Sequence, residues 1–149
     1  MKNQKFKKWA LPALLMSAMT FELMPGSVAY YTKELVTIPE GKTWNFFTPP
    51  VDGTVGYCLM LCAAVTFVAM VMAIAAACMN KQGLYRTIAW CSLGAGALAA
   101  APYMTNTADA FVQPNVVVFI LLLTCWLIAM SLDKKQDQEE NTKPQGRRL

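Results

Sequence analysis

The chain has 149 residues, of which 56% are hydrophobic and 15% are charged, and its formal net charge is +4. This length suits a single domain, and the charged fraction is well below the roughly 25% that is usual in a soluble domain. Residues 53–80, 87–108 and 110–132 contain no charged side chain. Three such windows leave too little polar surface for a soluble fold and predict an integral membrane protein.

The positive charges are confined to a few segments of the chain. Eleven of the 13 Lys and Arg residues precede Trp9, lie in residues 81–86, or follow Leu132. The positive-inside rule places such segments in the cytoplasm. Topology therefore accounts for the net charge, and attraction to anionic lipid is a minor addition. We expect the lipid bilayer as the partner of these charges and no nucleic acid.

The first 29 residues have two interpretations. Lysines precede a short charge-free core, residues 9–21, and small residues follow at positions 27–29, an arrangement typical of a cleaved signal peptide. The alternative, which we favour, is an uncleaved first transmembrane helix over residues 8–24, ended by the Pro-Gly pair at 25–26. Both interpretations place the following segment outside the cell.

Residues 28–48 predict a small extracellular β-hairpin. β-prone residues flank a Pro-Glu-Gly-Lys turn signal at positions 39–42. The returning strand carries Trp44, Phe46 and Phe47. We expect these three aromatic side chains to be exposed and to bind other membrane proteins or a second copy of this chain.

Three further crossings are expected over residues 57–79, 87–104 and 114–132. The first has 23 residues and rises about 34 Å as a helix, enough to cross a hydrocarbon core of about 30 Å. Residues 133–149 are polar and are expected to form a disordered cytoplasmic tail. The predicted fold is thus an all-α integral membrane protein, a four-helix transmembrane bundle over residues 1–132 that carries the hairpin.

Two stripes of small residues at a spacing of four mark the second and third expected helices. Such stripes let two helix backbones approach closely in lipid, where packing drives association. The short link at 81–86 makes these helices antiparallel neighbours, and we expect the stripes to meet, with Gly96 against Ala73. The stripe residues are Ala69, Ala73, Ala77, Ser92, Gly96 and Ala100.

Glu22 is the one carboxylate beside an apolar run in the amino-terminal half of the chain. A carboxylate inside a membrane bundle is a candidate proton- or cation-binding site of a small transporter or channel. A carboxylate at the outer interface, in contact with the headgroups, is the alternative. We favour the interface position, because Glu22 lies about 21 Å along the helix from Lys8.

The sequence offers little for catalysis or for metal binding. It has no histidine, the commonest general base and metal ligand. Cys58 and Cys62 share a helix face, but two cysteines alone make a poor metal site, so we interpret them as packing residues. No phosphate loop, nucleophile–base set or paired carboxylate is present. We therefore expect no enzyme activity, no cofactor and no metal.

Three short motifs carry a resemblance to known proteins. They are Met-Pro-Gly at 24–26, Trp-Asn-Phe-Phe-Thr-Pro at 44–49 and Gly-Tyr at 56–57, followed by three crossings. In these features the chain resembles small uncharacterised four-pass membrane proteins of Gram-positive anaerobic bacteria, which implies a bacterial membrane location but no activity. The layout is also similar to that of claudins in topology only, because the claudin Gly-Leu-Trp motif and paired outer cysteines are missing.

These patterns favour a non-enzymatic, multi-pass protein of the plasma membrane with both termini in the cytoplasm. Its expected role is structural, or that of a protein-interaction component acting through the aromatic residues of the hairpin. A small transporter or channel that uses Glu22 is the alternative, and a holin-like pore is a further one.

Overall fold

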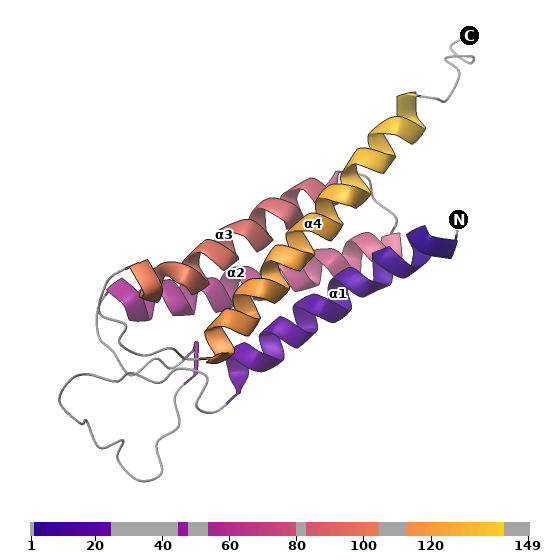
Figure 1. The fold of residues 1–149 in the computed structure, drawn as a ribbon. Coiled ribbons are helices and arrows are strands. Elements are labelled where there is room, and N and C mark those ends of the chain that lie inside the picture. The colour runs from indigo at the N-terminus through magenta and orange to yellow at the C-terminus, as the bar shows by residue number, and fades with distance from the viewer. Residues whose placement is uncertain (1, 25–44, 48–53, 80–82, 105–112, 142–149) are drawn as a thin grey trace, which may run out of the picture.

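The computed structural model describes residues 2–24, 45–47, 54–79, 83–104 and 113–141. Four helices make up almost all of these residues and lie side by side in an elongated bundle (Figure 1). They are α1 (Lys2–Leu23), α2 (Thr54–Met79), α3 (Leu84–Met104) and α4 (Gln113–Asn141). Two of them contain segments long and apolar enough to cross a membrane, Tyr57–Met79 and Val116–Lys134. The prediction of an all-α fold is confirmed for the described residues.

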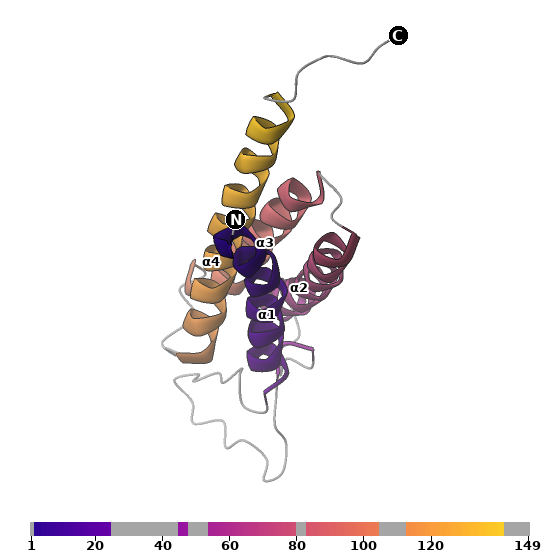
Figure 2. The same cartoon turned by 90° about the vertical axis from the view of Figure 1, so that its right-hand side faces the viewer.

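The helices form a ring in which each contacts two neighbours. α1 packs against α2 and α4, and α3 packs against the same two helices. Figure 2, an oblique view from the side on which the amino terminus lies, shows α1 between α2 and α4. The predicted pairing of α2 with α3 is confirmed. Consecutive helices run in opposite directions, so the start of α1 and the end of α4 lie at the same end of the bundle (Figure 1).

Each helix buries one narrow stripe of residues. The buried positions recur at alternating intervals of three and four, the spacing that brings one helix face against nearly parallel neighbours. α2 shows the pattern over most of its length. Its buried positions at these intervals are Leu59, Cys62, Thr66, Ala69, Ala73 and Ala76.

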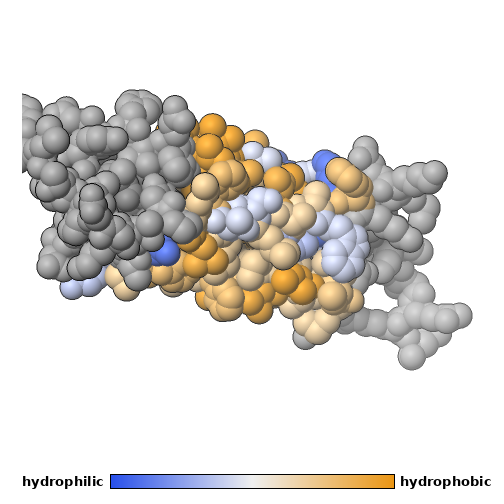
Figure 3. Space-filling view, turned by 90° about the horizontal axis from the view of Figure 1, so that it is seen from below, coloured by the Kyte–Doolittle hydropathy of each residue, from blue (hydrophilic) through white to orange (hydrophobic). Residues whose placement is uncertain are grey.

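Many small side chains fill the interior of the bundle, and many large apolar side chains cover its outside, unlike in a soluble protein. Alanine is the commonest residue of the buried core, whereas large apolar side chains lie on the outside. On α2 alone the exposed ones include Leu61, Phe67, Val68, Val71 and Ile74. The face drawn in Figure 3 is largely hydrophobic between its two ends, with paler patches. Close backbone packing inside and bulky apolar groups outside suit a bundle surrounded by lipid.

The helix bounds differ from the predicted ones mainly at the ends that carry charge. α1 begins at Lys2 rather than at residue 8. α4 continues to Asn141, so the prediction of a disordered tail is wrong for residues 133–141. This segment is rich in Lys, Gln and Glu, which are good helix formers, and it extends an existing helix without a nucleation cost. Residues 142–149 lie outside the described part of the chain.

The predicted β-hairpin falls mostly outside the described residues. Residues 45–47 are described, and they form no strand. Instead the Phe47 backbone N–H donates to Asn45 Oδ1 at 3.0 Å, and the Phe46 N–H donates to the Glu22 carbonyl at 3.1 Å. The returning strand is therefore wrong at these residues, because the asparagine side chain stabilises a local turn in its place.

The small-residue stripes do not meet as predicted. A Cβ atom added to Gly96 would lie 3.7 Å from the Leu122 Cβ and 3.8 Å from Phe119, so this glycine faces α4 and not α2. Helices joined by a short link bring together residues equally far from the link. Ala73 lies six residues before the end of α2, whereas Gly96 lies twelve residues after the start of α3. The pairing of Gly96 with Ala73 is therefore wrong.

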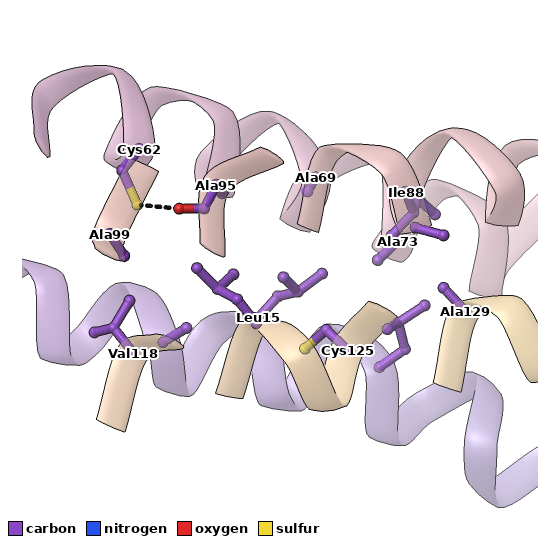
Figure 4. Close-up of a cluster of buried hydrophobic side chains, with 14 of the residues drawn as sticks. Leu15, Cys62, Ala69, Ala73, Ile88, Ala95, Ala99, Val118, Cys125 and Ala129 are labelled. Carbon is purple, nitrogen blue, oxygen red and sulfur yellow. Dashed lines mark hydrogen bonds between the residues drawn. The ribbon is translucent and has the colours of Figure 1, made fainter. Parts of the chain in front are cut away.

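The other stripe residues occupy mixed environments. Ala69, Ala73 and Ser92 are buried, whereas Ala77 and Ala100 are partly exposed. Near the end of α2 and the start of α3, Ala73 of α2 lies beside Ile88 of α3 (Figure 4). Small residues do line the bundle interior, but they are shared among several helix pairs rather than concentrated in one.

Candidate functional site

Glu22 lies inside the bundle. Its side chain has no exposed surface, although the residue belongs to the last turn of α1. The Cα–Cβ bonds of a helix tilt toward its amino terminus. A side chain in the last turn of α1 therefore projects back along the bundle instead of outward past the helix end. The burial of Glu22 contradicts the predicted contact of its carboxylate with the headgroups.

Two polar side chains of α2 meet the Glu22 carboxyl group. The Thr66 hydroxyl lies 2.9 Å from Glu22 Oε1, and the Cys62 thiol lies 3.7 Å from the same oxygen. Cys62 and Thr66 are four residues apart, so they share one face of α2. Both side chains are fully buried. The site thus joins the end of α1 to the interior face of α2.

A third helix contributes a backbone group. The Cys62 thiol lies 3.2 Å from the Ala95 carbonyl oxygen of α3, the contact drawn as a dashed line in Figure 4. The Thr66 hydroxyl also lies 2.9 Å from the Cys62 carbonyl, in the preceding turn of its own helix. The carboxyl group of α1 is therefore connected through α2 side chains to the backbone of α3.

The cluster lies deep in the apolar part of α2. Thr66 is nine residues from Tyr57 and thirteen from Met79, the ends of the candidate membrane span. At a rise of 1.5 Å per residue, these distances are about 14 Å and about 20 Å. Glu22 Oε1, in contact with Thr66, is thus nearer the middle of this span than either of its ends.

The predicted aromatic binding surface is only partly described. Phe46 is fully buried and belongs to the hydrophobic core, and Phe47 is partly buried against it. Trp44 lies outside the described residues. The prediction that Phe46 is exposed to a partner is wrong, because its ring packs inside the chain itself. The backbone bond from Phe46 to Glu22 fixes this segment over the end of α1.

The opposite end of the bundle carries the charges. Lys7 Nζ donates to the Ser131 hydroxyl at 3.0 Å and joins α1 to α4 there. We call this the basic end, and the other the Glu22 end. Glu22 is fourteen residues from Lys8, about 21 Å along α1. The charged side chains described at the basic end are Lys7, Lys8, Arg86, Asp133 and Lys134.

Ser92 and Tyr85 are two further buried polar residues, both on α3. Their hydroxyl groups have no hydrogen-bond partner within the described part of the chain. Ser92 was expected to be a small packing residue, and no role was predicted for Thr66. The one feature of the sequence that could have indicated a role for Thr66 is its position, four residues after Cys62 in an otherwise apolar run.

The donor set limits the chemistry of the site. Among the described residues, no group of three or more His, Cys, Asp or Glu side chains is placed to hold a metal ion. A buried carboxyl group beside one hydroxyl and one thiol is suited to binding a proton or a small monovalent cation. Comparisons with protein-family models, with curated proteins and with solved structures give no match.

Proposed function

We propose that this chain is a four-pass plasma-membrane protein that binds a proton or small cation at Glu22, as a small transporter or channel. One observation carries the proposal: the Glu22 carboxyl group is fully buried among helices and contacts the Thr66 hydroxyl. An ionisable group inside a membrane bundle is costly to insert and marks ion or proton pathways.

The surface of the bundle supports a membrane location for all four helices. α1 and α3 alternate around the ring with the two apolar spans. Exposed hydroxyl groups donate to the carbonyl four residues earlier, as in Ser17 to Ala13 at 3.0 Å and Thr124 to Ile120 at 2.8 Å. Hydroxyl groups that face lipid need such internal acceptors, because no water is available there.

The charge distribution supports an orientation with both termini in the cytoplasm. The start of α1 and the end of α4 share the basic end, together with Arg86. The positive-inside rule assigns that end to the cytoplasm. Trp9 and Trp90 are exposed near the same end, where interfacial tryptophan side chains are common.

The protein-interaction function has less support from the described residues than the Glu22 site. Its main argument was an exposed aromatic cluster, and the Phe46 ring of that cluster is buried in the core. Thr66 and Cys62 instead contact the ionisable Glu22 carboxyl group, and Cys62 also contacts the Ala95 carbonyl. We therefore favour transport over partner binding.

Flux measurements in proteoliposomes test the proposed function. Purified protein is reconstituted, and proton and sodium fluxes are followed with entrapped dyes under an imposed membrane potential. We expect Glu22→Gln to lower the flux at least tenfold, because the amide keeps the shape but cannot ionise. Thr20→Val, on an exposed face of the same helix, is the matched control and should retain it. Flux equal to that of empty liposomes, or unchanged flux in Glu22→Gln, would contradict the proposal.

A further inference from the structure

Each hydrogen-bond donor at Glu22 has two acceptors within reach. The Thr66 hydroxyl lies 2.9 Å from Glu22 Oε1 and 2.9 Å from the Cys62 carbonyl oxygen. The Cys62 thiol lies 3.7 Å from Glu22 Oε1 and 3.2 Å from the Ala95 carbonyl oxygen. A hydroxyl and a thiol each carry a single proton. Each donor must therefore favour one acceptor at a time.

We propose, building on the function proposed above, that the ligand of Glu22 is the proton and that Thr66 and Cys62 form a switch that follows its binding. With Glu22 ionised, both donors point to Oε1. When a proton from solvent binds Oε1, the new O–H donates to the Thr66 oxygen. The Thr66 hydroxyl then turns to the Cys62 carbonyl, and the Cys62 thiol turns to the Ala95 carbonyl. One O–H bond forms at Glu22, and no other covalent bond of the protein changes.

This arrangement supplies hydrogen bonds in both protonation states without a backbone movement. Buried polar groups are strongly destabilising when they lose their partners. A site that had to rearrange its helices at each protonation would add that cost to every cycle. Here two bond rotations keep the Thr66 and Cys62 protons donated in either state. The geometry therefore suits repeated binding and release of a proton.

A metal cation fits the same atoms less well. Hard cations are held by several oxygen ligands at once, whereas this cluster places a thiol beside the carboxyl group. Sulfur prefers soft metal ions. A cation between Glu22 and Thr66 would also turn the hydroxyl proton away from Oε1 without replacing that hydrogen bond. The proton needs no further ligands.

The surrounding titratable groups leave Glu22 as the group that changes charge. Among the described side chains, the uncharged titratable groups on α2, α3 and α4 are thiols and tyrosines. They are Cys58, Cys62, Cys78 and Tyr57 on α2, Cys91 and Tyr85 on α3, and Cys125 on α4. Thiols and phenols of ordinary pKa are uncharged at neutral pH. The described charged side chains on these elements lie at the basic end, as set out above. Protonation of Glu22 on α1 thereby changes the hydrogen bond between the Cys62 thiol and the Ala95 carbonyl of α3.

Infrared titration of the protein in nanodiscs tests the switch directly. A variant that retains Cys62 as its only cysteine gives one S–H stretching band. We expect a protonated-carboxyl C=O band to emerge as the pH is lowered and to be missing in Glu22→Gln. The S–H band should change frequency with the same midpoint, because the thiol exchanges one acceptor for another. In Glu22→Gln the S–H band should not change with pH.

Thr66 variants test the second donor. Thr66→Val removes the hydroxyl that stabilises the ionised carboxyl group, so the midpoint of the C=O band should move at least half a pH unit upward, about a threefold change in proton affinity. Thr66→Ser keeps the hydroxyl and should stay near the wild-type midpoint. If Thr66→Val does not fold, the S–H measurement, which leaves Thr66 in place, still decides.

The possible outcomes separate the switch from the proposed function. An S–H band that ignores pH, or a Thr66→Val midpoint equal to the wild-type one, would overturn the switch, while loss of flux in Glu22→Gln would still support a site at Glu22. Sodium flux without any titrating C=O band would also overturn it, because the ligand would then be a metal cation. Coincident C=O and S–H midpoints support it.

Discussion

The two ends of the bundle use polar residues in opposite ways. At the basic end, Lys7 and Arg86 lie at the margin of the bundle. The core there is mostly apolar, with Leu11, Ile88 and Leu132 fully buried, and the Tyr85 hydroxyl is its buried polar group. At the Glu22 end, a carboxyl group, a hydroxyl and a thiol occupy the interior itself. In the proposed function, charge at the margin sets the orientation in the membrane, and the carboxyl group in the interior binds the transported ion. The basic end should therefore contribute stability and the Glu22 end activity.

Truncation of the core near the basic end should give the largest loss of stability. Leu11 is fully buried in α1, and Leu11→Ala should lower the free energy of unfolding by about 2–4 kcal/mol, since lost contacts and a cavity both contribute. Leu127→Ala is the matched control, because the Leu127 side chain is 59% exposed. Thermal unfolding in detergent measures both. Equal losses would contradict the assigned inside and outside of the bundle.

Overpacking of the α3–α4 contact at the Glu22 end should have the next largest effect. Gly96→Leu must place a side chain against Leu122 and Phe119, and we expect a loss of about 1–3 kcal/mol. Gly96→Ala should be nearly neutral, because its Cβ would make ordinary contacts there. Gly94→Leu is the control, since nothing lies within 4 Å of an added Cβ at Gly94. The unfolding midpoint in detergent should be lowest for Gly96→Leu, and those of Gly96→Ala and Gly94→Leu should stay near the wild-type value.

Neutralisation of Glu22 should separate activity from stability. Glu22→Gln keeps the size of the side chain and its contact with the Thr66 hydroxyl, so we expect the stability to change by less than about 1 kcal/mol. The loss of flux should nevertheless be at least tenfold. Unfolding and flux are measured on one preparation. A stability loss as large as that of Leu11→Ala would mean that the carboxyl group is primarily structural.

Removal of the ammonium group at the basic end should have the smallest effect. Lys7→Met deletes the bond to Ser131, a partly buried hydrogen bond with a net value of about 0.5–1.5 kcal/mol. The apolar stem of methionine retains the packing, so the expected loss lies at the low end of that range. Proton flux should be unchanged. A large flux effect would show that the basic end takes part in transport.

Much of the fold follows from charge spacing along the sequence. The charge-free windows at 53–80 and 110–132 predict two long apolar helices, and the short link after the first makes its neighbour antiparallel. The spacing of charges does not show how each helix is rotated about its own axis. Gly96 was therefore assigned to the wrong partner helix, and the burial of Phe46 was missed.

The site itself was only half predictable. Glu22 was recognised as a candidate, but its depth depends on the direction in which its side chain leaves α1 and on which residues of α2 stand opposite. Thr66 lies within an apolar run, where a threonine usually bonds to its own backbone. Nothing in a single sequence shows that this hydroxyl also meets a carboxyl group from a residue 44 positions away.

α4 is one continuous helix, so a small tilt at one end moves its other end by several ångströms. Its 29 residues run from Gln113 at the Glu22 end to Asn141, seven residues past the apolar span. The helix is about 42 Å long, so a tilt of about 5° at one end displaces the other by about 4 Å. A spin label near Asn141 would therefore report small changes of helix packing beside Glu22 as measurable changes of distance.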